Sequence, residues 1–427
     1  MTITTSPATL TNIEDLTLPN GARLVYQHIP SAPRVAMACY IAGGNLMDPV
    51  LGAIDIIDRL LMKGTKTRSQ EDIAVAIDGL SLEMDVDSRR DYSVLGATLL
   101  PEDLDASFEL IHDIFYNATL AEFEREKVKI AGELHMELDS PKARASDGLF
   151  KTVYANTPYG LTSSVFLETL AQHSSVDEAM AQYHAIYQPS RMIWSVAGPI
   201  EKDELVEALT RWLPAKSQSA APNTHDTWVK TLNAYQLAQD VLLPLPKDDG
   251  NQAHIYQGWI APPVASDDYY PLAVMNTLLG AAGLTARLFL ELRDKQGLAY
   301  NVRSSYDAYC HSGLFYLYIG TEPKNRQKCL DGFRDECDKL VTVPVSDKEL
   351  AETKRNMLGR RAMALETAGQ KAGYIGSVVA SGRPLSHIEK FRERIAAVTA
   401  NDIQRVASNL FSKPSVIAIA GPSHCFE

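Results

Sequence analysis

The two halves of this 427-residue sequence are weak copies of each other. In each half a strand leads into an amphipathic helix, a charged helix follows, and a strand ending in Ala-Gly-Pro closes the half. The matching segments are residues 95–102 and 318–323, 108–115 and 329–340, 123–132 and 350–359, and 193–199 and 416–422. Repeats of this length indicate duplicated domains and not a solenoid of short units.

A small, polar, proline-containing stretch near the midpoint has the composition of a linker. We therefore predict a domain over residues 1–213, a linker over 214–228 and a second domain over 229–427. Hydrophobic periodicity predicts strands and helices that alternate irregularly within each half. The predicted strands in the first half are 24–28 and 35–41, and the predicted helices are 50–63, 70–78, 103–116 and 122–138. This pattern favours α+β domains in which helices cover a sheet.

Charge and composition exclude several classes of function. A net charge of −12 argues against nucleic-acid binding, which needs a basic face. No apolar run is long enough to span a membrane, and the first residues lack the basic and apolar regions of a secretory signal. The cysteines number five and are scattered without a C-x-x-C pair, which favours reduced thiols and predicts a cytoplasmic protein.

Residues 50–63 carry the most informative motif. Apolar residues recur there at helical spacing before Gly64, which predicts a buried helix ending at that glycine. Asp55, Asp58 and Arg59 lie at positions i, i+3 and i+4, the spacing of the zinc motif H-x-x-E-H. An arginine is always cationic and cannot bind zinc, so this helix is not expected to hold the metal.

The surrounding residues, Asp55-Ile-Ile-Asp-Arg-Leu-Leu-Met-Lys-Gly-Thr65, resemble the pitrilysin/insulinase family, the inverzincin peptidases. That family typically reads H-F-L-E-H-M-L-F-K-G-T at this point. The resemblance implies that Glu133 stands at the position of a third zinc ligand and Glu126 at that of another glutamate, seven residues before it. Both acidic residues are retained although the histidines are absent. The resemblance also implies two similar α+β domains that form half of a peptidase clamshell.

Three interpretations of the altered motif follow from its charges. In the first, Arg59 replaces the metal as the local cation and pairs with Asp55 and Glu133, because a buried carboxylate without a cation is costly. In the second, the motif has drifted and Asp55, Asp58 and Arg59 form a solvated polar face. In the third, Asp55, Asp58 and Glu133 hold Mg²⁺ or Mn²⁺, which the charge of Arg59 opposes.

A second motif, residues 281–306, is close to the family pattern S-R-L-F-x-E-L-R-E-K-x-G-L-A-Y-S-V. The resemblance implies that Arg293 and Tyr300 are the family's substrate-holding pair. A guanidinium and a tyrosine hydroxyl can donate hydrogen bonds to a peptide carbonyl and to the oxyanion that develops on it. In the alternative interpretation, Arg293 only caps a helix C-terminus and Tyr300 only packs in a strand.

The chain has lost the zinc motif and retains the Arg/Tyr motif, which predicts that two proteins together form the active site. The resemblance is strongest to the zinc-less subunit of bacterial heterodimeric peptidases of this family. It implies that zinc belongs to a homologous partner and that Arg293 and Tyr300 enter the partner's site, where peptides are hydrolysed. Homodimers of the isolated chain are compatible with this expectation. The alternative is an inactive structural or assembly protein, like the respiratory-complex core subunits that share the fold.

Overall fold

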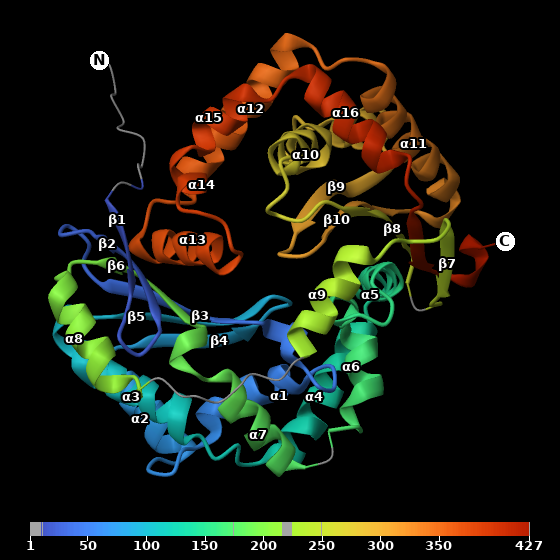
Figure 1. The fold of residues 1–427 in the computed structure, drawn as a ribbon. Coiled ribbons are helices and arrows are strands. Elements are labelled where there is room, and N and C mark those ends of the chain that lie inside the picture. The colour runs from blue at the N-terminus through green and yellow to red at the C-terminus, as the bar shows by residue number, and fades with distance from the viewer. Residues whose placement is uncertain (1–9, 11, 174, 216–223, 249, 427) are drawn as a thin grey trace. The chain divides into compact units, whose positions relative to one another are not determined.

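The computed structural model describes all residues except 1–9, 11, 174, 216–223, 249 and 427 (Figure 1). The chain divides into two compact units, and each contains one β-sheet with helices packed against it. Unit 1 comprises the described residues within 1–131, 168–228 and 361–389, and unit 2 those within 132–167, 229–360 and 390–427. The predicted α+β class is confirmed.

The sheet of unit 1 has six strands in the order β1-β2-β6-β3-β5-β4. Strands β2 and β6 are parallel, and the other neighbours are antiparallel. The strands are β1 (Ile13–Thr17), β2 (Arg23–His28), β3 (Val35–Ala42), β4 (Glu83–Ser88), β5 (Tyr92–Leu99) and β6 (Met192–Gly198).

The sheet of unit 2 has five strands in the order β7-β11-β8-β10-β9. Strands β7 and β11 are parallel, and the other neighbours are antiparallel. The strands are β7 (Val241–Pro246), β8 (Ala253–Ala261), β9 (Ala299–Ala308), β10 (Gly313–Thr321) and β11 (Val416–Gly421). Apart from β1, the two sheets have the same order and strand directions, which supports the repeat inferred from the sequence.

The helices lie close to the positions that periodicity predicts. The predicted helix 50–63 begins later, as α1 and a following 3₁₀ turn, because Gly52 adopts a left-handed conformation with φ of 95°. In the first half of the sequence the α-helices are α1 (Ala53–Leu60), α2 (Gln70–Gly79), α3 (Leu104–Asn117), α4 (Phe123–Leu138), α5 (Pro141–Val153), α6 (Ser163–Leu170), α7 (Val176–Ile186) and α8 (Lys202–Trp212). In the second half they are α9 (Thr224–Ala234), α10 (Tyr269–Asn276), α11 (Arg326–Thr342), α12 (Asp347–Met363), α13 (Ala368–Ala380), α14 (Ser386–Glu389), α15 (Phe391–Ala397) and α16 (Ala400–Phe411).

Each unit contains a helix from the other half of the sequence. Helix α13 packs on β3 and β6 of unit 1, where the Tyr40 hydroxyl donates to the Gly373 carbonyl at 2.6 Å. The Ser195 hydroxyl donates to the Ala372 carbonyl at 2.7 Å. Helix α5 packs on β8 and β11 of unit 2. Of the predicted linker, residues 216–223 lie outside the described part of the chain, and residues from 224 onward form α9.

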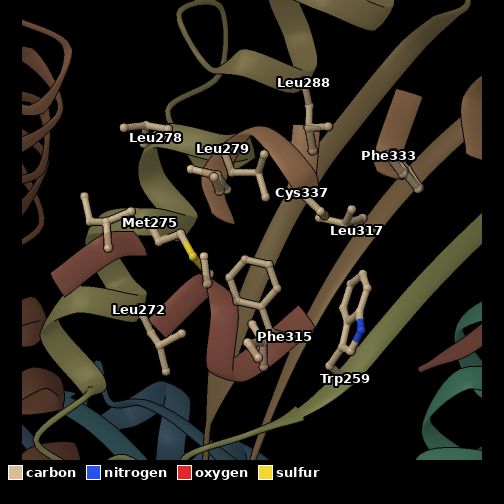
Figure 2. Close-up of a cluster of buried hydrophobic side chains, with 14 of the residues drawn as sticks. Trp259, Leu272, Met275, Leu278, Leu279, Leu288, Phe315, Leu317, Phe333 and Cys337 are labelled. Carbon is tan, nitrogen blue, oxygen red and sulfur yellow. The ribbon is translucent and has the colours of Figure 1, made fainter. Parts of the chain in front are cut away.

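The core of unit 2 lies between its sheet and helices α10, α11 and α16. Figure 2 shows Phe315 and Trp259 on the strands, with Leu272 and Met275 of α10 and Phe333 of α11 in the same cluster. In unit 1, Val25 of β2 packs in a cluster with Ile375 and Val379 of α13. Within the described ranges, none of the helices combines the length and apolar character that a membrane-spanning helix needs.

Candidate functional site

Asp48 fixes the start of α1, the helix that carries the altered zinc motif. Its carboxylate accepts hydrogen bonds from the backbone amides of Gly52, at 2.8 Å, and Ile54, at 2.9 Å. These amides would otherwise be unsatisfied at the helix N-terminus. Burial raises the pKa of the Asp48 carboxyl, and the nearby charge of Asp55 raises it further. The residue is therefore a structural cap.

Asp58, at the position of the catalytic glutamate in H-x-x-E-H, is turned into the protein. It is 4% exposed and accepts hydrogen bonds from Ser88 at 2.7 Å, Ser93 at 2.6 Å and the Tyr187 hydroxyl. Burial raises the pKa of the Asp58 carboxyl, and the three hydroxyl groups oppose that rise. Asp58 is thus a buried structural carboxylate, and the expectation of a solvated polar face is wrong for this residue.

Asp55, at the position of the first zinc-binding histidine, is held by an amide. Its Oδ2 accepts a hydrogen bond from Asn45 Nδ2 at 2.9 Å. Burial raises the pKa of Asp55 to about 6, although the Asn45 hydrogen bond and the charge of Arg59 act in the opposite direction. The charge of Arg59 acts on Asp55, and the ion pair between the two residues stays a prediction.

Glu126 on α4 is surrounded by cations. Its side chain is 6% exposed and lies 3.9 Å from Arg59 Nη1, 3.8 Å from Lys63 Nζ and 3.9 Å from Lys129 Nζ. A buried carboxylate needs such compensation. Arg59, which is predicted to replace the metal as the local cation, thus lies beside Glu126. Pairing of Arg59 with Glu133, which lies two helical turns further along α4, stays a prediction.

The residues at this position do not suit a zinc ion. Arg59 has no lone pair to offer, and both oxygens of Asp58 accept hydrogen bonds from hydroxyl groups. Over the residues that the structure describes, histidine, cysteine and acidic side chains form no group of three or more that could hold a metal ion. The same contacts of Asp58 disfavour the Mg²⁺ or Mn²⁺ site built from Asp55, Asp58 and Glu133.

The second motif brings Arg293 and Tyr300 together in unit 2. The Arg293 guanidinium lies 4.6 Å from the centre of the Tyr300 ring and 4.5 Å from that of Phe289, as in cation–π contacts. Its Nη1 donates to the Tyr300 carbonyl at 2.8 Å. Tyr300 itself is 82% exposed. The pair is therefore preorganised and accessible.

Irregular backbone produces this arrangement. Arg293 lies in a π-helical segment, Phe289–Lys295, a rare conformation that is often found at functional sites. Gly297 has φ of 63° and turns the chain into β9. The register of β9 against β10 shifts at Tyr300, because Asn301 pairs with Gly320 and Ala299 with Thr321. Tyr300 is thus the extra residue of a bulge, which directs it outward.

Sequence reasoning missed the residues that fix the orientation of the motif. Asn45 and Asp48 precede α1, and Tyr187 comes from α7, far along the chain. The Asp48–Pro49 pair ahead of the helix is a visible signal for a cap. Lys63 lies within the motif, in the family's Lys-Gly-Thr segment, and is visible as a second cation for Glu126. Nothing in the local sequence indicates that Tyr187 contacts Asp58.

Two family models match this chain. Residues 23–164 match the family model described as "Insulinase (Peptidase family M16)", and residues 174–357 match "Peptidase M16 inactive domain". The chain belongs to peptidase family M16. The resemblance to the insulinase family inferred from the sequence is therefore confirmed.

Relatives of this M16 protein carry zinc protease names. The chain is 26% identical over 419 residues to an uncharacterized zinc protease, YmxG, of Bacillus subtilis, covering 96% of this chain and 98% of the relative. It is 28% identical over 415 residues to an uncharacterized zinc protease of Streptomyces coelicolor, covering 95% and 89%.

Solved structures share the fold along nearly the whole chain. A peptidase M16 inactive domain from Pseudomonas fluorescens superposes with a TM-score of 0.85 at 19% identity, covering 96% of this chain and 98% of that one. A protease from Helicobacter pylori gives a TM-score of 0.85 at 20% identity, covering 96% and 99%. At this identity the likeness establishes the fold alone.

Proposed function

We propose that this M16 protein is the zinc-less, substrate-binding subunit of a heterodimeric zinc metallopeptidase. In this proposal the partner is a homologous subunit that carries zinc and activates water. The present chain supplies Arg293 and Tyr300, which hold the peptide substrate and its developing oxyanion. The observation that carries the proposal is the stacked, exposed Arg293–Tyr300 pair.

The chemistry of the pair suits a peptide carbonyl. A guanidinium has five N–H donors in a fixed plane, and one of its nitrogens donates to the Tyr300 carbonyl. That contact and the two ring contacts limit the rotamers of Arg293, so less entropy is lost when a substrate binds. Donors placed in advance where negative charge develops lower the activation barrier.

The altered motif in unit 1 complements this role. Asp58 faces hydroxyl groups and Arg59 lies beside Glu126, so the chain has no general base at the position where the family carries one. Water activation is therefore assigned to the partner. The alternative function, an inactive structural protein of the same fold, gives no reason for an exposed tyrosine held by an arginine at a strand bulge.

The test measures zinc content and hydrolysis of a fluorogenic peptide for three samples. These are the chain alone, a zinc-bearing M16 homologue from the same organism alone, and the two mixed. We expect no zinc and no turnover in the isolated chain, and turnover that depends on mixing. Zinc with turnover in the isolated chain would overturn the proposal, and absence of turnover in every sample would favour the structural role.

Tyr300→Phe separates catalysis from assembly in the same complex. The variant keeps the ring contact with Arg293 and loses only the hydroxyl, so the complex should form while kcat/KM falls about 10- to 100-fold. Lys295→Met is the matched control, because Lys295 lies on the same π-helical segment and forms an ion pair with Glu291, four residues before it, at 2.5 Å. Equal turnover in the Tyr300→Phe and control complexes would remove the catalytic role.

A further inference from the structure

Helix α8 begins beside the edge strand β1 of unit 1, where Lys202 Nζ lies 2.8 Å from Glu14 Oε2. It follows β6 directly and packs against α3 (Figure 1). At its end, Arg211 Nη1 lies 2.7 Å from Asp105 Oδ1, and Trp212 Nε1 donates to the same oxygen at 2.9 Å. His112 of α3 contacts the Trp212 carbonyl through its Nδ1.

The repeat defines the matching positions in unit 2. Pro101 and Pro323 each begin a 3₁₀ turn that leads into α3 and α11, respectively. When the two helices are aligned from these prolines, four positions of α3 correspond to four of α11. Asp105, Phe108, His112 and Phe115 correspond to Gln327, Leu330, Arg334 and Cys337, respectively. All four of these α11 residues line an open groove of about 780 Å³. The groove therefore occupies the place in unit 2 that α8 fills in unit 1.

Up to Phe426, the chain after β11 takes a different path from the chain after β6. After β11 the chain enters a 3₁₀ turn, Ser423–Cys425, which Arg326 contacts through the Cys425 carbonyl. Phe426 then packs against the core of unit 2. None of the residues 423–426 lines the groove.

Two leucines at matching places in the sheets differ in exposure, and in unit 1 the leucine also pairs with Leu16 of β1. Leu24 of β2 pairs with Trp194, and both residues are 0% exposed. At the matching place, Leu242 of β7 pairs with Ile417 and is 64% exposed. Leu242, Ile417, Trp259 and Phe411 give the groove an apolar floor. A single exposed leucine is ordinary, but several apolar side chains gathered in one groove are a common feature of interaction surfaces.

The charges in the groove suit the end of a helix. Arg334, which lies 2.7 Å from Asp331, stands where His112 meets the last carbonyl of α8. Lys413, Asp240 and Asp338 also line the groove. A helix C-terminus carries a partial negative charge, which a cation at this place would stabilise. A strand is a less suitable occupant, because Pro244 and Pro246 remove backbone donors from β7.

We propose that this groove binds an amphipathic helix of a partner protein. The helix carries leucine-type side chains at i and i+4 and an aromatic residue three positions later, as Leu205, Leu209 and Trp212 do on α8. Its C-terminal end lies at Arg334. This surface is separate from Arg293 and Tyr300, so the proposal stands independently of the catalytic role.

The test uses a fluorescent, helix-stabilised synthetic peptide with the sequence of residues 200–213, added to the full-length chain. We expect saturable binding at micromolar concentrations in fluorescence anisotropy. Leu242→Asp and Arg334→Glu should each weaken binding at least about tenfold. Leu242 is exposed, so its variant should fold, which circular dichroism and thermal melting will show. The matched control is Val75→Asp, at a residue that is 71% exposed on α2.

Several results would overturn the proposal. The first is absence of saturable binding by the peptide, and the second is binding that Leu242→Asp leaves unchanged. Equal weakening by the Val75→Asp control would show that the peptide recognises net charge and not the groove. A third result concerns self-association. If the wild-type chain is a dimer that Leu242→Asp converts to a monomer, the occupant is a second copy of this chain and not a partner's helix.

Discussion

Arg293 holds Tyr300 by two contacts at once. The guanidinium stacks on the ring, 4.6 Å from its centre, and donates to the carbonyl of the same residue at 2.8 Å. The backbone contact fixes the bulge, and the ring contact fixes the side chain above it. Removing the arginine should therefore affect the position of Tyr300 as well as the charge at the site.

In the mixed complex, we expect Arg293→Met to lower kcat/KM by about 10- to 100-fold, because both the donor group and the support for Tyr300 are lost. Arg293→Lys should give an intermediate loss, since lysine keeps the charge without the planar fork. Fluorogenic peptide kinetics at several substrate concentrations will measure both. Arg293→Met kinetics that match those of Lys295→Met would contradict the assignment.

Asp58→Ala is expected to cost about 3 kcal/mol of unfolding free energy, because the hydroxyl groups of Ser88, Ser93 and Tyr187 lose their buried acceptor. Denaturant unfolding of the isolated chain measures this, with exposed Asp78→Ala as the control. Turnover per folded complex should stay unchanged. A large loss of turnover with normal stability would show that Asp58 acts in catalysis.

Asp55 predicts a pH dependence of stability. Its pKa in the folded protein is about 6, above the value near 4 of an unfolded chain. Between these values the folded state binds the proton more tightly, so this residue's contribution to stability falls as pH rises from about 4 to about 6. Asp55→Asn removes the effect and should be more stable than the wild type by up to about 2 kcal/mol above pH 6.

Unfolding of the Asp55→Asn variant and the wild type at a series of pH values tests this sign. The two curves should converge below about pH 4, where both side chains are neutral in either state. The asparagine can still accept the hydrogen bond from Asn45 through its side-chain carbonyl. A constant offset between the curves at every pH would show that Asp55 ionises normally in the folded protein.

Arg59→Ala should lower the free energy of unfolding by only about 0.5–1 kcal/mol. The Arg59 side chain is 40% exposed, and Lys63 and Lys129 remain near Glu126. Removing Lys63 as well should cost more than the sum of the single changes, since the buried Glu126 then keeps one cation. Urea unfolding measures the losses, and the Glu126→Gln background should abolish the coupling. No loss in either variant would refute the role of Arg59 as a replacement cation.

Local sequence predicted the elements that depend on nearest neighbours. Apolar residues at helical spacing located α1, and the predicted helix 122–138 matches α4, Phe123–Leu138. The repeat of segments predicted two sheets of α+β type, which the matching strand orders support. These features follow from periodicity and turn chemistry, which are properties of short segments.

Contacts between distant segments decided the chemistry at α1. Helical spacing sets Asp55, Asp58 and Arg59 at fixed angles around the axis, but it does not say what each one meets. Ser88, Ser93 and Tyr187 lie 30, 35 and 129 residues from Asp58, and their hydroxyl groups make it a structural residue.

Tertiary structure also decided which helices belong to each unit. Helices α5 and α13 have ordinary amphipathic sequences, yet each packs on the sheet that the other half of the chain builds. The groove of unit 2 likewise forms between segments that lie far apart in the sequence, among them β7, α11 and the end of α16. The sequence determined which segments form helices and strands, because those preferences are local. Only the folded chain determined their neighbours, because packing depends on shape and burial over the whole molecule.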